Sequence, residues 1–439
     1  MTTEAIIEAD LTWTGAAFAS GVRIKVNARG RIEAVGDRSI GETTLRLRDR
    51  ALLPGFVNAH SHAFQRGLRG RGETFPSGQG DFWLWREAMY ELVGRLDEAR
   101  LYELTTQAYR EMLSAGITTV GEFHYLHHDG RGDNFAFDEV VLRAARDVGI
   151  RIVLLNAFYF TGGFDETGHT PLSGGQQRFA TRSLDSYWLQ MDRLTGLIDP
   201  EMQSLGVVAH SIRAVPVDLL PPLHAEAARR GLVFHMHLEE QPREIEECIR
   251  HYGRTPMALV NEHVEVSPLF TAVHATHTNE ADMENFLESG GNVCLCPLTE
   301  ANLGDGLANV PWILKHGGHV ALGSDSNARI SMLEEARWME YGQRLAHQRR
   351  GVCRDEEGSV ATTLLSAMTV HGARSLGVRA GQIRRGAAAD FVSIDLTAPA
   401  LRGTGEENLA AGLTLGADER AIDDVCVAGR WLGGSERAG

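Results

Sequence analysis

Two histidines separated by a single residue close the segment Pro54-Gly-Phe-Val-Asn-Ala-His60-Ser-His62. Residues two apart on a β-strand point to the same side, so both imidazoles can reach one metal ion. Alone the pair is a weak signal, because two surface histidines after a glycine-containing turn have the same spacing. Its weight comes from further metal-binding side chains that follow other predicted strands.

A second group of ionisable residues lies in Phe234-His-Met-His-Leu-Glu-Glu240. The same alternation places His235 and His237 on one side, so one is a third ligand while the other is buried and hydrogen-bonded. We favour His237 as the ligand, because it is nearer the strand end. Glu240 is predicted at the pocket rim, where a carboxylate near the metal but not bound to it can shuttle protons. The alternative role for Glu240 is to begin the next helix, where carboxylates are favoured.

Two later segments supply the remaining groups. His274 ends one predicted strand, and Asp325 follows the last one in Gly323-Ser-Asp325-Ser-Asn327. Three neutral imidazoles and one carboxylate leave a position open for water, as in a catalytic metal site. His274 is predicted to polarise or orient a substrate group. With these ligands we expect one divalent ion, Zn²⁺, with Fe²⁺ and Mn²⁺ as alternatives.

Arginine, tyrosine and histidine residues also gather after predicted strands. Arg213 lies in His210-Ser-Ile-Arg213, Tyr125 follows Glu122-Phe-His, and Arg86 lies in Phe82-Trp-Leu-Trp-Arg86. A guanidinium group recognises a carboxylate through two parallel hydrogen bonds. Two arginines beside a metal site therefore predict a small anionic substrate, whereas each arginine taken singly is more often a surface residue.

Eight short apolar runs, most of them closed by polar residues, must position these side chains. Most intervals have helical spacing, as in 139–148, 219–230, 281–289 and 333–347. Apolar strands alternating with helices predict an α/β fold, and eight repeats predict a (β/α)8 TIM barrel with catalytic residues at the C-terminal strand ends. A doubly wound open sheet is the alternative, disfavoured because no glycine-rich phosphate loop follows the first strand. The runs are Ala51–Val57, Ile117–Glu122, Arg151–Asn156, Gly206–His210, Leu232–His237, Phe270–His274, Asn292–Cys296 and His319–Gly323.

Both ends of the chain have the alternating pattern of short strands, as in 22–27, 44–48, 390–395 and 424–432. Each end alone is too short to bury a core. We therefore predict a small composite β-sandwich domain from residues 1–57 and 380–439, and a barrel domain from 58–379. Two long insertions, 70–80 and 161–182, follow strand ends and are predicted lids over the site.

The composition excludes several classes of protein. The chain has 439 residues, 43% hydrophobic and 23% charged, which is typical of a globular protein. Its formal net charge of −15 and the absence of a basic stripe argue against a nucleic-acid partner. No signal peptide or membrane-spanning segment is predicted. Five scattered cysteines suit a reducing cytoplasm better than a disulfide framework.

Taken together, these motifs resemble the amidohydrolase superfamily over nearly the whole chain. The segment 54–62 resembles its first metal-binding motif, and Gly386-Ala-Ala-Ala-Asp390-Phe-Val resembles part of its composite β domain. A glutamate after the third histidine, followed by a downstream histidine and aspartate, is similar to the mononuclear deaminase branch. No lysine stands where the binuclear branch carries a bridging carbamate.

Within that branch, four segments resemble deiminases of histidine degradation: 60–66, 122–125, 210–215 and Cys296-Pro-Leu-Thr-Glu-Ala-Asn-Leu-Gly-Asp-Gly306. The resemblance implies hydrolysis of N-formimino-L-glutamate, an anionic amidine, to N-formyl-L-glutamate and ammonia by a metal-bound hydroxide, and we expect a homodimer. It implies metal ligands His60, His62, His237 and Asp325, catalytic residues Glu240, His274 and Asp325, and substrate-binding residues Gln65, Arg86, Tyr125, His210 and Arg213.

Three positions depart from the pattern of these deiminases: Glu239 replaces an expected Ala, Leu298 a usual Thr and Asn327 an expected His. None removes a predicted ligand or acid. A deaminase of purine, pyrimidine or triazine rings is the first alternative, and Arg86 and Arg213 argue against it because a base pocket favours stacking faces. A non-catalytic assembly protein is the second, and the full set of ligands with Glu240 argues against it.

Overall fold

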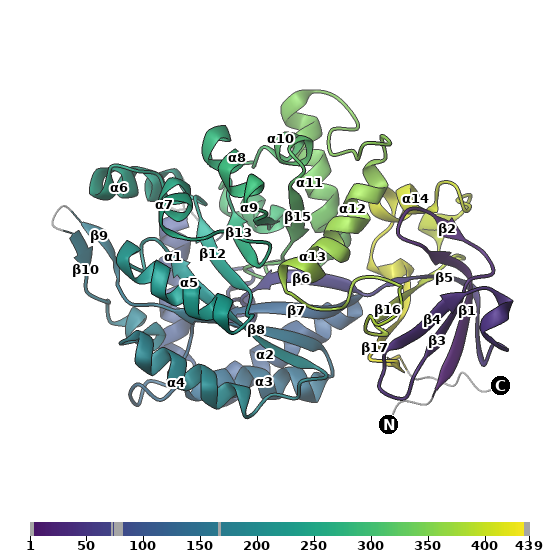
Figure 1. Cartoon of the computed structure of the whole chain (residues 1–439), viewed down its shortest axis with the longest axis horizontal. Coiled ribbons are helices and arrows are strands. Elements are labelled where there is room, and N and C mark those ends of the chain that lie inside the picture. The colour runs from purple at the N-terminus through teal and green to yellow at the C-terminus, as the bar shows by residue number, and fades with distance from the viewer. Residues whose placement is uncertain (1–3, 72, 74–81, 166–167, 434–439) are drawn as a thin grey trace.

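Eight parallel strands form the central sheet, and each lies beside the next in chain order (Figure 1). The structure is a computed structural model that describes residues 4–71, 73, 82–165 and 168–433. Nearly every residue of these strands is buried, as the continuous apolar runs predict. The strands are β6 (Phe56–Ser61), β7 (Ile117–His124), β8 (Arg151–Phe158), β11 (Gln203–Ser211), β12 (Phe234–Leu238), β13 (Phe270–His274), β14 (Asn292–Leu295) and β15 (His319–Leu322).

The segment after β15 returns to β6 and closes the sheet into a barrel. The carbonyl of His60 accepts hydrogen bonds from the backbone N–H groups of Ser324 at 2.9 Å and Asp325 at 3.0 Å. The N–H of His62 donates to the carbonyl of Asp325 at 2.9 Å. The predicted TIM barrel is therefore confirmed, and its closure brings the last strand end against the first.

Helices surround the barrel and connect successive strands (Figure 1). The four predicted helical intervals are confirmed as α3, α5, α8 and α11. Side chains at several N-caps accept the first free N–H groups, as Ser331 does for Glu334 at 3.1 Å before α11. The helices are α1 (Phe82–Arg95), α2 (Glu98–Ser114), α3 (Ala136–Val148), α4 (Leu184–Thr195), α5 (Leu220–Arg229), α6 (Pro242–Tyr252), α7 (Pro256–His263), α8 (Glu280–Glu288), α9 (Pro297–Leu303), α10 (Val310–Lys315), α11 (Met332–His347), α12 (Val360–Met368) and α13 (Val370–Ser375).

A second sheet joins the two ends of the chain. Strand β5 pairs antiparallel with β16, so N-terminal and C-terminal segments share one sheet and one apolar core. The predicted small β domain is thereby confirmed, while its exact residue boundaries stay a prediction. Its strands are β1 (Ala5–Trp13), β2 (Phe18–Ala19), β3 (Arg23–Val26), β4 (Ile32–Gly36), β5 (Leu45–Pro54), β16 (Phe391–Asp395), β17 (Ile422–Val427) and β18 (Arg430–Trp431).

The first predicted apolar run, Ala51–Val57, is two strands in the structure. Residues up to Pro54 belong to β5 in the small sheet, and β6 begins the barrel at Phe56. The run showed no break because both strands are buried on both faces, so no polar residue separates them. Gly55 is the corner: a Cβ there would lie 2.1 Å from the hydroxyl of Thr118.

The C-terminal segment is not confined to strands. Between β16 and β17 it forms the helix α14 (Leu409–Gly416), which packs against α11 and α12 of the barrel. Arg337 of α11 donates from Nε to the carbonyl of Thr414 at 3.2 Å and from Nη2 to that of Ala417. The segment from β16 to β18 therefore contributes to both the small sheet and the barrel wall.

The structure describes the two predicted insertions to different extents. The insertion 70–80 lies almost wholly outside the described residues. The insertion 161–182 forms a hairpin of β9 (Gly163–Asp165) and β10 (Gly168–Thr170), followed by the 3₁₀ helix η3 (Gly175–Phe179). Its position over the site is described below.

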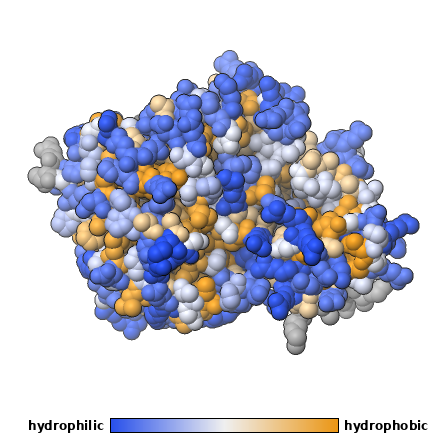
Figure 2. Space-filling model, in the orientation of Figure 1, coloured by the Kyte–Doolittle hydropathy of each residue, from blue (hydrophilic) through white to orange (hydrophobic). Residues whose placement is uncertain are grey.

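Hydrophilic residues cover most of the face shown in Figure 2, with smaller hydrophobic groups between them. Among the described helices, none combines the length and apolar character needed to cross a bilayer. All five cysteines are free and buried.

A buried ion pair connects the barrel to the small sheet. Arg151, the first residue of β8, donates from Nε and Nη2 to the two carboxylate oxygens of Asp390 at 2.8 and 3.1 Å. Arg151→Met leaves that carboxylate buried without its cation, so we expect the free energy of unfolding to fall by about 3–5 kcal/mol in urea titrations. Lys25→Met breaks the more exposed pair with Glu33 and should cost less than about 1 kcal/mol. Equal effects of the two substitutions would contradict the prediction.

Candidate metal centre and substrate pocket

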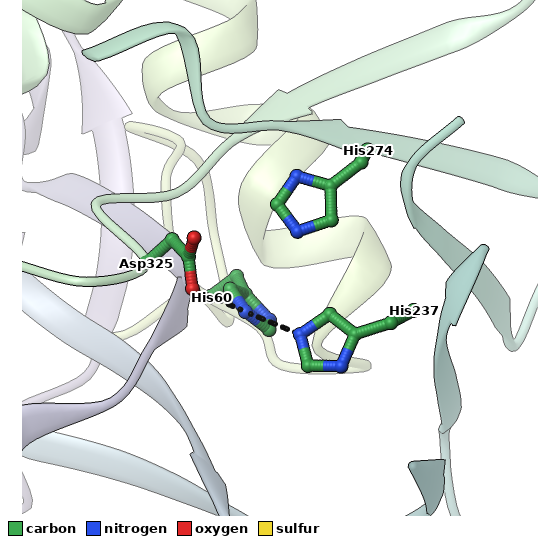
Figure 3. A group of neighbouring side chains, drawn as sticks. All are labelled: His60, His237, His274 and Asp325. Atoms are coloured by element: carbon green, nitrogen blue, oxygen red, sulfur yellow. Dashed lines mark hydrogen bonds and ion pairs between the residues drawn. The ribbon is translucent and has the colours of Figure 1, made fainter. Parts of the chain in front are cut away.

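The C-terminal ends of four barrel strands bring metal-binding groups together. His60 lies on β6, His237 on β12, His274 ends β13, and Asp325 follows β15. Each offers one ligand atom, and these atoms all lie within 4.8 Å of one another (Figure 3). The four side chains are buried.

His62 completes the group from the other side of Asp325. The Oδ1 atom of Asp325 lies 3.3 Å from Nε2 of His60 and 3.2 Å from Nε2 of His62. Nε2 of His60 also lies 3.2 Å from Nε2 of His237, along the dashed line in Figure 3. Contacts of 3.2–3.3 Å thus connect the Nε2 atoms of His60, His62 and His237 with Oδ1 of Asp325.

The hydrogen bonds of the outer ring nitrogens show that these residues fit a cation. Nδ1 of His62 lies 2.7 Å from the carbonyl of Phe123, and Nδ1 of His237 lies 3.2 Å from that of His210. Each Nδ1 must therefore carry the proton, which leaves the lone pair of Nε2 directed at the centre. Nε2 of His60 lies 3.2 Å from Nε2 of His237, so a cation at this point could be bound by both rings.

Burial sets the charges of the group. It lowers the pKa of His60 to about 3, so this imidazole is neutral and able to bind a metal. Burial alone would raise the pKa of Asp325, but the neighbouring rings of His60 and His62 hold it well below its usual value. The Phe123 ring packs against His237 with centroids 4.1 Å apart and against His60 at 4.8 Å, which excludes water beneath the centre.

The backbone is strained at two of these residues. His274 has φ = 70° and Asp325 has φ = 40°, both in the left-handed region that non-glycine residues rarely adopt. Such conformations cost on the order of 1–3 kcal/mol each and persist where the surrounding structure holds them. The hydrogen bonds that close the barrel hold Asp325 in this conformation.

Glu240 and His274 form a second pair beside the metal-binding group. Nε2 of His274 lies 3.7 Å from Oε1 of Glu240, and Nδ1 lies 3.3 Å from Oε1 of Glu300. Burial would lower the pKa of His274, but the charge of Glu240 and contact with Glu300 raise it well above its usual value. Burial raises the pKa of Glu240, which favours a form able to give up a proton.

One pocket connects this group to all five predicted substrate-binding residues. The pocket opens beside His62, His237, Glu240, His274 and Asp325, and Gln65, Arg86, Tyr125, His210 and Arg213 form the rest of its polar lining. The structure therefore brings every predicted site residue to one place, with His60 buried beneath the pocket.

Three of these residues are arranged by their neighbours. Nε2 of Gln65 donates to the hydroxyl of Tyr125 at 2.7 Å, so the hydroxyl hydrogen of Tyr125 remains for another acceptor. The protein acceptor nearest to it is the Met89 sulfur at 4.0 Å. His210 is neutral, because burial and the charge of Arg213 lower its pKa well below the usual value.

Several pocket residues were missed by the sequence analysis. They are aromatic or apolar side chains that line the pocket between the arginines: Trp85, Met89, Tyr90, Tyr159, Phe179 and Leu303. Trp85, Arg86, Met89 and Tyr90 share one face of α1, and their spacing of three and four residues would have identified them had the helix been predicted. Phe179 belongs to the insertion 161–182, which therefore does reach the site.

His235, which lies on β12 two residues before His237 and is not assigned as a metal ligand, has a different hydrogen-bonding partner. Nε2 of His235 lies 2.9 Å from the carbonyl of Ser375, and burial lowers its pKa to about 4. It is directed at α13 and away from the metal-binding group.

Two of the three departures from the deiminase pattern, Asn327 and Glu239, have a structural role for their side chains. Asn327 donates from Nδ2 to the Ser61 hydroxyl at 3.1 Å and accepts from the Ser324 hydroxyl at 2.7 Å, which fixes the Asp325 turn to β6. Glu239 accepts the N–H of Met257 at 2.9 Å at the start of α7. The N–H of Leu298 donates to Glu335 at 2.8 Å, a contact that any residue but proline can make.

Residues 51–432 match the Amidohydrolase family, and the chain belongs to this family of metal-dependent hydrolases. It is 37% identical to a formimidoylglutamate deiminase of Pseudomonas aeruginosa over 420 residues, covering 94% of this chain and 91% of that protein. It is 30% identical to a 5-methylthioadenosine/S-adenosylhomocysteine deaminase of Syntrophobacter fumaroxidans, covering 80% and 73%. A crystal structure of an amidohydrolase from Brucella melitensis superposes with a TM-score of 0.84 at 32% identity, covering 97% and 94%.

Proposed function

We propose that this chain hydrolyses N-formimino-L-glutamate to N-formyl-L-glutamate and ammonia. The observation that carries the proposal is that Arg86 and Arg213 line the same pocket as Glu240 and the metal-binding group. Two cations suit the two carboxylates of a glutamate derivative. The similarity to a formimidoylglutamate deiminase supports the same substrate.

We assign the metal ligands as His60, His62, His237 and Asp325. His274 is the competing donor, but its two nitrogens face Glu240 and Glu300, so we assign it to proton handling. This set of nitrogen and oxygen donors suits zinc. The chemistry that a bound cation supplies here is the acidification of water, towards a pKa of about 7.

The chain's own residues then manage the protons of the reaction. The Asp325 carboxylate accepts the proton that water loses on attacking the formimino carbon, and the protonated ring of His274 orients the attacking oxygen. The tetrahedral carbon expels nitrogen only as ammonia, because amide ion is too basic to leave. Glu240, 3.7 Å from His274, gives that nitrogen its proton, and its raised pKa keeps a proton available.

The remaining polar residues hold the substrate. Arg213 and Arg86 bind its carboxylates, and the Tyr125 hydroxyl, directed by Gln65, donates to one of them. Fixing both ends of the glutamate portion places the formimino carbon beside Glu240, and such alignment is a large part of catalysis.

The competing function is deamination of an adenosine-like ring, favoured by the relative from Syntrophobacter and by the pocket's aromatic residues. A substrate panel separates the two. We expect ammonia release from N-formimino-L-glutamate with a kcat/KM at least about a hundredfold above that for 5'-methylthioadenosine, S-adenosylhomocysteine or adenosine, the ratio that a site built for a polar group readily reaches. The reverse order would replace the proposal by the ring deaminase.

Loss of an arginine contact is expected to weaken substrate binding. Arg213→Met removes one charge-assisted carboxylate contact, so we expect KM for N-formimino-L-glutamate to rise about 10–100-fold, corresponding to roughly 1.5–3 kcal/mol. Arg213→Lys keeps the charge without the bidentate geometry and should lie between. Arg250→Met, on the exposed side of α6, is the control and should leave KM unchanged. An unaltered KM in Arg213→Met would remove this residue from the binding site.

A further inference from the structure

A second cluster of histidines and a carboxylate lies behind the substrate pocket. His124 ends β7, His127 follows in the next loop, and Asp138 lies in the first turn of α3. All three are buried, and none lines the pocket or belongs to the group proposed to bind metal. The described structure thus contains two such clusters, and the proposed reaction uses only one of them.

Asp138 accepts four hydrogen bonds. Its Oδ1 atom lies 2.8 Å from Nδ1 of His127 and 3.1 Å from Nε2 of His124. Its Oδ2 atom accepts from the side-chain amides of Asn156 at 2.8 Å and Gln190 at 3.0 Å. Burial would raise the pKa of Asp138, but the charge of His127 and the bonds from both rings hold it far below its usual value.

His127 is the cationic partner of this carboxylate. Its second nitrogen, Nε2, lies 2.8 Å from the carbonyl of Ala157, so each ring nitrogen faces an oxygen acceptor. A neutral imidazole has one N–H and satisfies only one acceptor, whereas an imidazolium donates to both. Asp138 and His127 therefore form a buried ion pair whose other hydrogen-bonding positions are filled by neutral partners.

The distances argue against a metal ion in this cluster. Ligand atoms about 2.0–2.1 Å from a tetrahedral ion lie roughly 3.3 Å apart. The first cluster has such separations, 3.2 and 3.3 Å, whereas His127 and Asp138 are hydrogen-bonded at 2.8 Å. A metal would also require Nδ1 of His127 to lose the proton that it donates to Asp138.

This ion pair joins two segments that carry pocket residues. His124 and His127 flank Tyr125, and the carbonyl of Phe123, one residue earlier, accepts from His62. On the neighbouring strand β8, Asn156 and Ala157 lie just before Tyr159. Tyr125 and Tyr159 both line the pocket.

We infer that Asp138 is a positioning residue. Through its ion pair with His127 it holds Tyr125 and Tyr159 in place in the wall of the substrate pocket. It acts through these residues and touches neither the substrate nor the group proposed to bind metal. The inference rests on the proposed function for its kinetic consequence, and on the structure alone for the ion pair.

The first test is Asp138→Asn, which keeps the volume but presents an N–H to groups that are themselves donors. We expect KM for N-formimino-L-glutamate to rise roughly 10–100-fold, because a displacement of about 1 Å has effects of that size. We expect kcat to change less than about threefold and bound zinc per chain to stay constant. Asp147→Asn is the control on the same helix, because Asp147 accepts only an exposed hydrogen bond from Tyr102.

A second variant covers the case in which Asp138→Asn does not fold. Gln190→Leu removes one amide donor at the outer edge of the cluster and retains the ion pair. We expect a smaller rise in KM with unchanged kcat. Unchanged KM in every variant that folds, accompanied only by lower thermal stability, would overturn the positioning role.

The ion pair has a readout that needs no substrate. In ¹⁵N-labelled protein, both ring nitrogens of His127, assigned by comparison with His127→Gln, should have the chemical shifts of N–H groups, because each faces an oxygen acceptor. A neutral His127, or a second equivalent of zinc that Asp138→Asn removes, would overturn the inference. If the wild type releases no ammonia from N-formimino-L-glutamate, the proposed function fails, while the spectrum still decides the ion pair.

Discussion

Glu240→Gln is expected to lower kcat for ammonia release from N-formimino-L-glutamate by about 10²–10⁴-fold, the range that a positioned general acid contributes. The amide has nearly the volume of the carboxyl group but no proton to give to the departing nitrogen. Glu240 is buried in the pocket, 3.7 Å from His274. The measurement is the initial rate of ammonia release under saturating substrate.

Two variants make the result specific. Glu240→Asp retains an acid but withdraws it by one methylene, so its kcat should lie between those of the wild type and Glu240→Gln. Glu246→Gln alters an exposed carboxylate on the neighbouring α6 and should have wild-type kcat. Zinc content and the circular dichroism spectrum should be the same in all variants. Retention of more than about a tenth of kcat in Glu240→Gln would exclude Glu240 as the acid.

Removal of the metal is expected to lower activity by at least about 10³-fold, because polarisation by a metal contributes several kcal/mol. Dialysis against a chelator should produce this loss, and one equivalent of Zn²⁺ should restore the rate. The proposed ligands His60, His62, His237 and Asp325 belong to the first and fifth barrel strands and to the segments that follow β6 and β15, so a bound cation would connect parts of the chain that are far apart in sequence. Bound metal should therefore raise the thermal midpoint in proportion to the logarithm of its free concentration.

The thermal measurement separates the catalytic ion from an adventitious one. Asp325→Ala should lose both the activity and the zinc-dependent rise in thermal midpoint. His235→Gln changes a histidine of the same strand as His237 that is directed at Ser375, and it should retain the zinc response. Full activity of the chelated protein, with zinc below one-hundredth of an equivalent, would contradict the metal-dependent mechanism.

The spacing of apolar and polar residues in the sequence was sufficient to predict the barrel and the end of it at which the catalytic residues gather. Strand residues alternate, and parallel strands in a closed barrel present their C-terminal ends to one side, so polar residues that end apolar runs must meet there. This logic alone predicts that His60, His62, His237, Glu240, His274 and Asp325 lie together. It failed locally at Ala51–Val57, where two strands in different sheets are equally apolar and no polar residue marks the corner at Gly55.

The residues that line the substrate pocket were only partly predictable from the sequence. Arg213 was identified because an arginine at a strand end has a specific chemical use, whereas Arg86, which lies on α1, was identified mainly through the resemblance to the deiminases. Tyr159 and Phe179 were not, since an aromatic residue has the same sequence signature in a core as in a pocket. Only the packing of α1 and of the insertion 161–182 over the barrel mouth separates the two uses.

By itself, then, the sequence determined the class of fold, the strand ends and the residue types available for catalysis, because these depend on local spacing. The tertiary structure determined which of these residues lie together and which tautomer or charge each of them has. Closure of β15 on β6 brings Asp325 to His60 and His62. Backbone carbonyls that face the Nδ1 atoms of His62 and His237 determine the tautomers of these two rings. The pairing of His127 with Asp138 likewise depends on partners from separate elements, which no local pattern records.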